Sequence, residues 1–248
     1  MLSITYFYRK LFCRKGYGVH SPFVFDLITN VIEEKSFYYA YHDISLIREQ
    51  LIQKKRFIDY NGEQINLKKA LRKYGISKKE GEFLFRLTNH YKPRTILSIS
   101  SSGGLAPLYL SRYGSNVECV TLEYETDLYD LAVHFLNRET NTSHYIWLCS
   151  YYDFYPPKIS MFNQIDCIYM GKELGVNSLY YSFNQCIPLI HDKTFCVLAG
   201  IHSSTEKLNY WNELCQHPNV TVAVDLYQMG LLFFDPKLNK RVYKTIIP

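Results

Sequence analysis

The C-terminal two thirds of the chain alternates short apolar stretches with amphipathic ones, and this alternation constrains the fold more than any other feature. Strand candidates occupy 95–99, 117–122, 145–149, 165–170, 194–199, 220–226 and 231–234, and helix candidates occupy 105–113, 126–138, 177–190 and 205–215. Parallel strands need long crossovers, and such crossovers are usually helices. The pattern therefore predicts an α/β fold with a doubly wound, mostly parallel sheet that helices cover on both faces.

The last two strand candidates are separated only by "YQMG", which is too short for a crossover. They are expected to form a hairpin, so the final strand runs antiparallel to a neighbour. The complete prediction is a Rossmann-like sheet of seven strands with a C-terminal antiparallel hairpin strand.

Residues 1–75 precede this pattern and are predicted to form a helical appendage to an α/β domain at 76–248. Ser21 and Pro22 mark a helix start, and residues 57–75 are expected to form a surface loop with a short helix. Ser77 followed by Glu80 is the signature of a capping box. Residues 1–80 hold 15 Lys and Arg against 8 Asp and Glu, so the appendage carries the net positive charge.

The basic residues form short pairs and triplets among helical residues, which favours a solvated surface over a nucleic-acid site. Seven cysteines show no CxxC pairing, which is typical of a reduced, cytoplasmic protein. No stretch reaches the roughly 18 apolar residues of a membrane span, and the first 15 residues lack the pattern of a signal peptide. We therefore expect a cytoplasmic protein with no membrane partner.

The stretch "TILSISSSGGLAPLYL" at 95–110 reads as a strand, a turn of small residues and a helix start. Glycines in such a turn allow positive φ and close approach of a ligand, and the helix start offers free N–H groups. Glu123 ends the next strand, about twenty residues beyond the turn, where an acid can accept hydrogen bonds from ribose hydroxyls. An acid at a strand end is more often a surface residue or a helix cap.

Three segments carry a resemblance to a known family: "KGYGVHSPFVFD" at 15–26, "ISKKEGEFLFRLTNHYKPRTIL" at 76–97 and "HPNVTVAVDLYQMGLLFF" at 217–234. The chain resembles class I S-adenosylmethionine-dependent methyltransferases, specifically small-molecule O-methyltransferase-like proteins with an N-terminal KGxGxHSPFVFD segment. The similarity covers nearly the whole chain. It implies the fold above, S-adenosylmethionine as cofactor and a small-molecule substrate that the sequence does not identify.

The resemblance also shows where this chain departs from the family. Ser98 stands where an acid would face the cofactor's ammonium group, and Ser100 stands where the first glycine would be. Tyr151 follows the third strand, where an aromatic ring could stack on adenine, although ordinary packing is the commoner role. The predicted cofactor-binding residues are Ser98, Ser100, Ser102, Gly104, Glu123 and Tyr151.

Metal-dependent members of the wider group carry carboxylates after the fourth and fifth strands. Here those positions read Gly171-Lys172 and Ala199-Gly200, so we expect no metal ion. His202 follows the fifth strand and could act as a general base near neutral pH, although a lone histidine there is more often a helix-entry residue or simply exposed.

The resemblance and these residues together leave three functions open. The chain is either a metal-independent methyltransferase, since orientation alone can drive transfer from a sulfonium, or an inactive protein of that fold acting as a binding or scaffolding module. A nucleic-acid modifier that uses the basic appendage ranks last. The N-terminal helices either cover the cofactor cleft or form a homodimer interface.

Overall fold

The computed structural model describes residues 4–13, 15–16, 18–53, 57–60, 63–73, 75–137, 142–149 and 162–248. Tyr151 lies outside these ranges. Along the chain the elements are α1 (Ile4–Phe12), α2 (Pro22–Leu27), η1 (Ile28–Ile32), α3 (Tyr39–Gln53), β1 (Phe57–Tyr60), β2 (Glu63–Asn66), α4 (Leu67–Lys73), α5 (Lys78–Tyr91), β3 (Thr95–Ile99), α6 (Leu105–Ser111), β4 (Val117–Glu123), α7 (Thr126–Leu136), β5 (Thr142–Leu148), β6 (Cys167–Met170), α8 (Val176–Cys186), η3 (Ile187–Leu189), β7 (Phe195–Ala199), α9 (Thr205–Gln216), β8 (Val222–Asp225), β9 (Met229–Phe233) and β10 (Arg241–Lys244).

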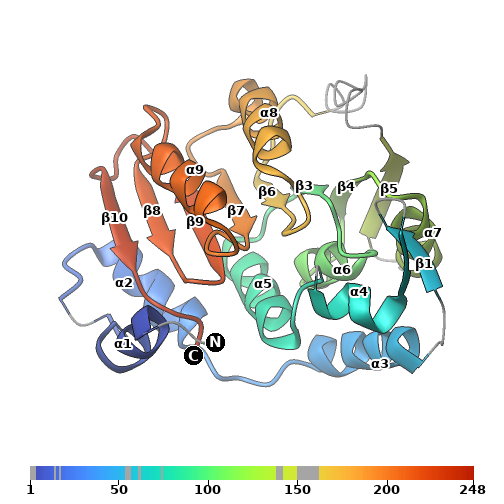
Figure 1. Ribbon diagram of the computed structural model, residues 1–248. Helices are drawn as coiled ribbons and strands as arrows, with labels where there is room; N and C mark the ends of the chain where they lie inside the picture. Colours follow the sequence, from blue (N-terminus) through green and yellow to red (C-terminus); the bar gives the residue numbers. More distant parts are fainter. Residues whose placement is uncertain are drawn as a thin grey trace.

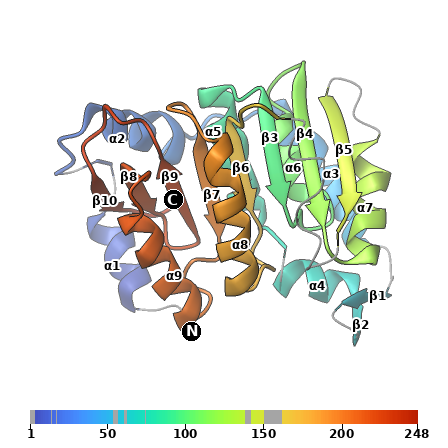
Figure 2. The same ribbon diagram turned by 90° about the horizontal axis from the view of Figure 1, so that it is seen from above.

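The main sheet has the strand order β10-β8-β9-β7-β6-β3-β4-β5 (Figures 1 and 2). Strand β9 is antiparallel to both β7 and β8, and the other neighbouring strands of this sheet are parallel. The doubly wound sheet and its antiparallel hairpin strand are confirmed. From β3 the chain adds β4 and β5 on one side and then β6 and β7 on the other, so the direction of the crossovers reverses between β3 and β6. Ligands of open α/β sheets bind at the carboxyl ends of the strands near such a reversal.

The prediction of seven strands was wrong, because β10 adds an eighth. It pairs in parallel with β8 at the edge of the sheet. Its four residues, Arg-Val-Tyr-Lys, are exposed or half-buried. A strand without a buried face lacks the apolar pattern from which the other strands were predicted.

A second small sheet consists of β1 and β2, which pair antiparallel from Phe57↔Asn66 to Tyr60↔Glu63. The surface loop predicted for this segment is therefore a hairpin, followed by the short helix α4. The two helix starts predicted from sequence are confirmed: Ser21 Oγ accepts from Val24 N at 3.4 Å, and Ser77 and Glu80 form a reciprocal capping box.

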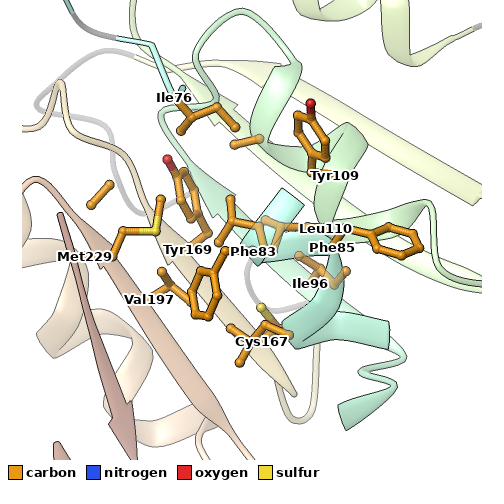
Figure 3. Packing of buried hydrophobic residues seen from close by; sticks show 14 of the residues in the cluster. Ile76, Phe83, Phe85, Ile96, Tyr109, Leu110, Cys167, Tyr169, Val197 and Met229 are labelled. Atoms are coloured by element: carbon orange, nitrogen blue, oxygen red, sulfur yellow. The ribbon is translucent and has the colours of Figure 1, made fainter. Parts of the chain in front are cut away.

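The core lies on both faces of the main sheet, as the strict alternation of β7 shows. Phe195, Val197 and Ala199 belong to the cluster under α2, η1, α5, α6 and α7, whereas Cys196 and Leu198 belong to the cluster under α8 and α9. This is the period of two that a buried strand requires. Figure 3 shows Phe83 of α5 packed among strand residues such as Tyr169 and Val197.

The N-terminal helices share this core. Val24 and Leu27 of α2 are fully buried in the same cluster as Val222 and Phe233 of the main sheet. The rings of Phe23 and Phe233 meet edge to face with their centroids 4.9 Å apart. In both views α1 and α2 lie beside β10, at one end of the sheet (Figures 1 and 2).

Candidate functional site: two corners at the carboxyl ends of the strands

The β3–α6 turn, residues 100–104, has an unusual backbone. Ser100 and Ser102 adopt φ of 61° and 56°, and Gly103 and Gly104 adopt φ of 66° and 88°. The left-handed region costs a residue with a side chain roughly 1–2 kcal/mol. Ser100, which stands where the resemblance places the first glycine, thus has a strained backbone, and so does a second serine, Ser102. Such strain persists only where surrounding contacts fix the backbone.

Glu123, at the end of β4, supplies those contacts. Its Oε1 accepts from the backbone N–H of Ser101 at 2.7 Å and also from the Ser101 hydroxyl. The same hydroxyl oxygen accepts from Gly104 N at 2.8 Å, where α6 begins. Glu123 is only 1% exposed. The residue predicted to bind ribose therefore holds the turn together and presents no open carboxylate to a ligand.

The turn also packs tightly against β6. A Cβ atom placed on Gly171 would lie 2.3 Å from the carbonyl oxygen of Ser100. A side chain at position 171 is therefore incompatible with this turn unless the backbone moves. The absence of an acid at position 171 and the left-handed backbone of Ser100 are thus two parts of one arrangement, in which the turn fills the space that a carboxylate would need.

Glu173 closes the same corner from the β6–α8 connection. Ser102 Oγ donates to its Oε1 at 3.1 Å, and its Oε2 is buried without a hydrogen-bond partner among the described residues. Ser98, on β3, is fully buried and its hydroxyl likewise has no partner there. The structure thus brings together Ser98, Ser100, Ser102, Gly104 and Glu123, but it brings them together as packed interior.

Burial sets the charge state of this corner. The pKa of Glu123 is raised to about 8, first by burial and second by the nearby Glu173 carboxylate, while the hydrogen bonds from Ser101 act in the opposite direction. Burial also raises the pKa of Glu173. Two neighbouring buried acids favour protonation of at least one, and the charge of Lys207 opposes this only at Glu173. This corner is consequently poor in negative charge at neutral pH.

These residues do not fit an S-adenosylmethionine molecule as the family would bind it. The ammonium group would meet the hydroxyl of Ser98 in place of a carboxylate. Binding of ribose by Glu123 would break its two hydrogen bonds with Ser101. It would also cost Gly104 N its hydrogen bond to the Ser101 hydroxyl.

A cavity of about 590 Å³ lies at the opposite edge of the sheet, beside the starts of β3 and β4. It is lined by residues that include Lys92, Arg94 and Tyr113.

A second corner lies where β7 and β8 end, and it is built on charges. Asp225 is 2% exposed and receives two hydrogen bonds from the Arg9 guanidinium of α1, at 2.5 and 2.8 Å. His202 Nε2 lies 3.0 Å from Asp225 Oδ2. Burial alone would raise the pKa of Asp225, but the hydrogen bonds from Arg9 and His202 and the charge of Arg9 hold it well below its usual range.

Tyr227 completes this corner. Its ring stacks on His202 with centroids 4.7 Å apart, and the Arg9 guanidinium lies 5.6 Å from the ring centre. Its backbone N–H donates to Asp225 Oδ1 at 2.8 Å, with φ of 73°. His202, predicted as a weak general base, is thus held at Nε2 by the Asp225 carboxylate. Its Nδ1 has no hydrogen-bond partner among the described residues.

Among the described residues there is no group of three or more His, Cys, Asp or Glu side chains that could hold a metal ion. Lys207 Nζ donates to the carbonyl of Lys172 at 2.6 Å, which brings a second amine to the connection after β6. The Lys207 amine, whose charge acts on Glu173, disfavours a divalent cation there. No helix in the described part of the chain is long and apolar enough to cross a membrane.

The strand order, with one antiparallel strand near the C-terminal edge of a parallel sheet, gives the chain the fold of S-adenosylmethionine-dependent methyltransferases. No protein-family model matches the chain, and no curated protein matches it. Among solved structures it is similar to an O-methyltransferase from Bacillus cereus in complex with SAH, with a TM-score of 0.55 and 16% identity over 85% of this chain and 96% of that one.

Two further structures show the same likeness. The O-methyltransferase TomG of Streptomyces achromogenes, involved in tomaymycin synthesis and in complex with SAM, has a TM-score of 0.52 and 13% identity over 86% of this chain and 94% of that one. A methyltransferase from Geobacter sulfurreducens has a TM-score of 0.51 and 13% identity over 82% and 91%. These likenesses establish the methyltransferase fold.

Sequence reasoning missed Arg9 and Asp225, and it placed Ser101 in the turn and Glu173 after the fourth strand without assigning either of them a role. Asp225 carried the same signal as Glu123, since "VAVD" and "VTLE" are both apolar strands that end in an acid. Arg9 was one of several cations in a basic segment, and nothing local separates a buried arginine from an exposed one. The lesson is that both strand-end acids were detectable, but their partners were not.

Proposed function

We propose that this chain is a methyltransferase-fold protein without methyl-transfer activity, which acts as a binding or scaffolding module. One observation carries the proposal: the Glu123 carboxylate is buried and engaged by Ser101, within the turn that would have to receive the cofactor. The packing of Gly171 against Ser100 supports it, because the turn cannot open without moving two strand ends together.

Energetics make reopening of the corner unfavourable. Breaking the contacts of Glu123 would forfeit two hydrogen bonds to Ser101, each worth roughly 0.5–1.5 kcal/mol, or more if the acid is ionised. A neutral hydroxyl at Ser98 would recover little from the cofactor's ammonium group. The loss corresponds to at least about one decade in cofactor affinity, at roughly 1.4 kcal/mol per decade.

Isothermal titration calorimetry with S-adenosylmethionine and with S-adenosylhomocysteine tests the proposal. We expect no saturable heat at millimolar ligand. The matched variant is Ser101→Ala, which removes the hydroxyl that engages Glu123. Saturable binding by the wild type that Glu123→Ala weakens would overturn the proposal.

The alternative function, metal-independent methyl transfer to a small molecule, is favoured by one observation, the pairing of His202 with Asp225 at 3.0 Å. A carboxylate behind an imidazole orients it and supports its action as a general base. This candidate requires the cofactor, so the same titration addresses it first. Measurable transfer that His202→Gln abolishes, with Mg²⁺ without effect, would establish it in place of the inactive module. The cytoplasmic location stays a prediction.

A further inference from the structure

Helix α1 has an inverted distribution of polarity. One of its two charged residues, Arg9, is buried against Asp225, while Leu11 and Phe12 are 73% and 66% exposed. Phe7 and Tyr8 are more than half exposed as well. Positions 7, 8, 11 and 12 recur at helical spacing and therefore form one continuous stripe on the outer side of the helix. We refer to these four side chains as the outer face of α1.

The inner side of α1 fixes this orientation. Arg9 binds Asp225 through two hydrogen bonds, and the ring of Tyr6 meets that of Tyr227 edge to face at 5.3 Å. The Thr245 hydroxyl donates to the carbonyl of Cys13, one residue beyond the end of the helix, at 2.5 Å. The helix thus cannot rotate its apolar stripe inward without breaking a buried ion pair, a change that costs about 3–5 kcal/mol.

The two chain segments at this end of the molecule are rich in cations. Residues 1–25 contain four Lys and Arg, of which Arg9 is paired with Asp225, and no Asp or Glu, and residues 235–248 contain four Lys and Arg and one acid. Glu33 approaches this end through its contact with the backbone N–H of Lys15. The remaining residues hold 20 Lys and Arg against 22 acids, so the two terminal segments account for the whole net charge of +5. Both segments lie at the same end of the sheet, where α1 and β10 are neighbours (Figures 1 and 2).

We propose that the outer face of α1 docks on an anionic lipid surface, with its aromatic and leucine side chains at the headgroup boundary and exposed cations such as Lys10 and Lys15 against lipid phosphates. An apolar stripe flanked by Lys and Arg, on a helix with no acid, is the pattern of an interfacial helix that lies on a membrane. Each such cation near an anionic surface contributes about 1 kcal/mol.

Charge complementarity decides between this partner and a second copy of the chain. A homodimer through α1 would bring residues 1–25 of two copies together, and these segments contain Lys and Arg but no acid. An anionic bilayer instead attracts the cations of both terminal segments. The proposal departs from the sequence-based expectations of no membrane partner and of dimerisation through the N-terminal helices. The reason is that the buried position of Arg9, which turns the apolar stripe outward, is visible only in three dimensions.

Flotation of the full chain with two kinds of vesicle tests the proposal. One kind consists of phosphatidylcholine alone, and the other contains phosphatidylserine as about one third of its lipid. We expect binding to the second kind and little to the first. Leu11→Ser with Phe12→Ser should weaken binding about tenfold or more. The matched control is Tyr39→Ser, which removes an even more exposed aromatic side chain from α3 and should bind like the wild type.

Three outcomes would overturn the proposal. The first is absence of binding to the anionic vesicles. The second is equal binding to both kinds, or binding that the double variant retains. The third is a wild-type mass in light scattering of twice 29.3 kDa that the double variant returns to one copy, without any vesicle binding. Both substituted positions, Leu11 and Phe12, are largely exposed, so circular dichroism of the double variant should match that of the wild type.

Discussion

Glu123 and Asp225 occupy equivalent places, each at the carboxyl end of a strand of the main sheet and each almost fully buried, yet the structure treats them in opposite ways. Glu123 faces neutral donors and a second acid, and its pKa rises to about 8. Asp225 faces Arg9 and His202, and its pKa falls despite burial. The comparison shows that the donor, more than depth of burial, sets the charge of a strand-end acid.

The difference extends to what each corner can do. In the Glu123 corner the polar groups hydrogen-bond to one another, and they connect the ends of β3, β4 and β6. The Asp225 corner holds a full ion pair that fastens α1 to the sheet and thereby orients the outer face of α1. The Glu123 corner has the position of a cofactor site, but its polar groups are buried. The Asp225 corner fixes the orientation of the outer face of α1.

The largest expected effect is that of Asp225→Asn. It leaves the buried Arg9 charge without its partner and should lower the free energy of unfolding by about 3–5 kcal/mol in urea denaturation. Asp130→Asn, at an exposed position of α7, is the control and should change it by less than about 0.5 kcal/mol. A loss below about 1 kcal/mol for Asp225→Asn would mean that the ion pair does not fasten α1.

The pH dependence of Glu123→Gln sharpens the comparison. Because the folded pKa is raised above the unfolded value of about 4.5, the wild type loses stability as pH rises from about 4.5 to about 8, and the loss is complete above the folded pKa. The variant, which cannot ionise, should gain on the wild type by the order of a few kcal/mol between pH 5 and pH 9. Urea denaturation across that range measures it, and a difference independent of pH would contradict the raised pKa.

Ser101→Ala has a smaller expected effect. The hydroxyl it removes both donates to Glu123 and accepts from Gly104 N, so we expect a loss of about 1–3 kcal/mol in thermal or urea unfolding. Ser98→Ala is a matched control in the same corner, since that hydroxyl is buried and has no partner among the described residues. Equal losses for the two variants would show that Ser101 does not hold the turn.

The smallest expected effect is that of His202→Phe. Stacking on Tyr227 is preserved, and only the hydrogen bond to Asp225 is lost, so stability should fall by about 1 kcal/mol. Thermal unfolding at pH 7 is sufficient to measure it. A loss as large as that of Asp225→Asn would indicate that His202, and not Arg9, is the main partner of the acid.

The sequence predicted the sheet well because buried parallel strands are continuous apolar runs. Strands 95–99 and 194–199 were located within one residue of β3 and β7. The strand β10 escaped, since an exposed edge strand has no apolar face. In the site, Glu123 was found from its place at a strand end, but its partner Ser101 was not, because the direction of a carboxylate depends on packing between β4 and the turn, which no local pattern records.

The most direct test of the account is calorimetric titration of the wild type with S-adenosylmethionine at pH 7. The closed corner predicts no saturable heat up to millimolar ligand. A dissociation constant well below millimolar, weakened by Glu123→Ala, would show that Glu123 leaves Ser101 to receive the cofactor, and the account of a closed corner would be wrong.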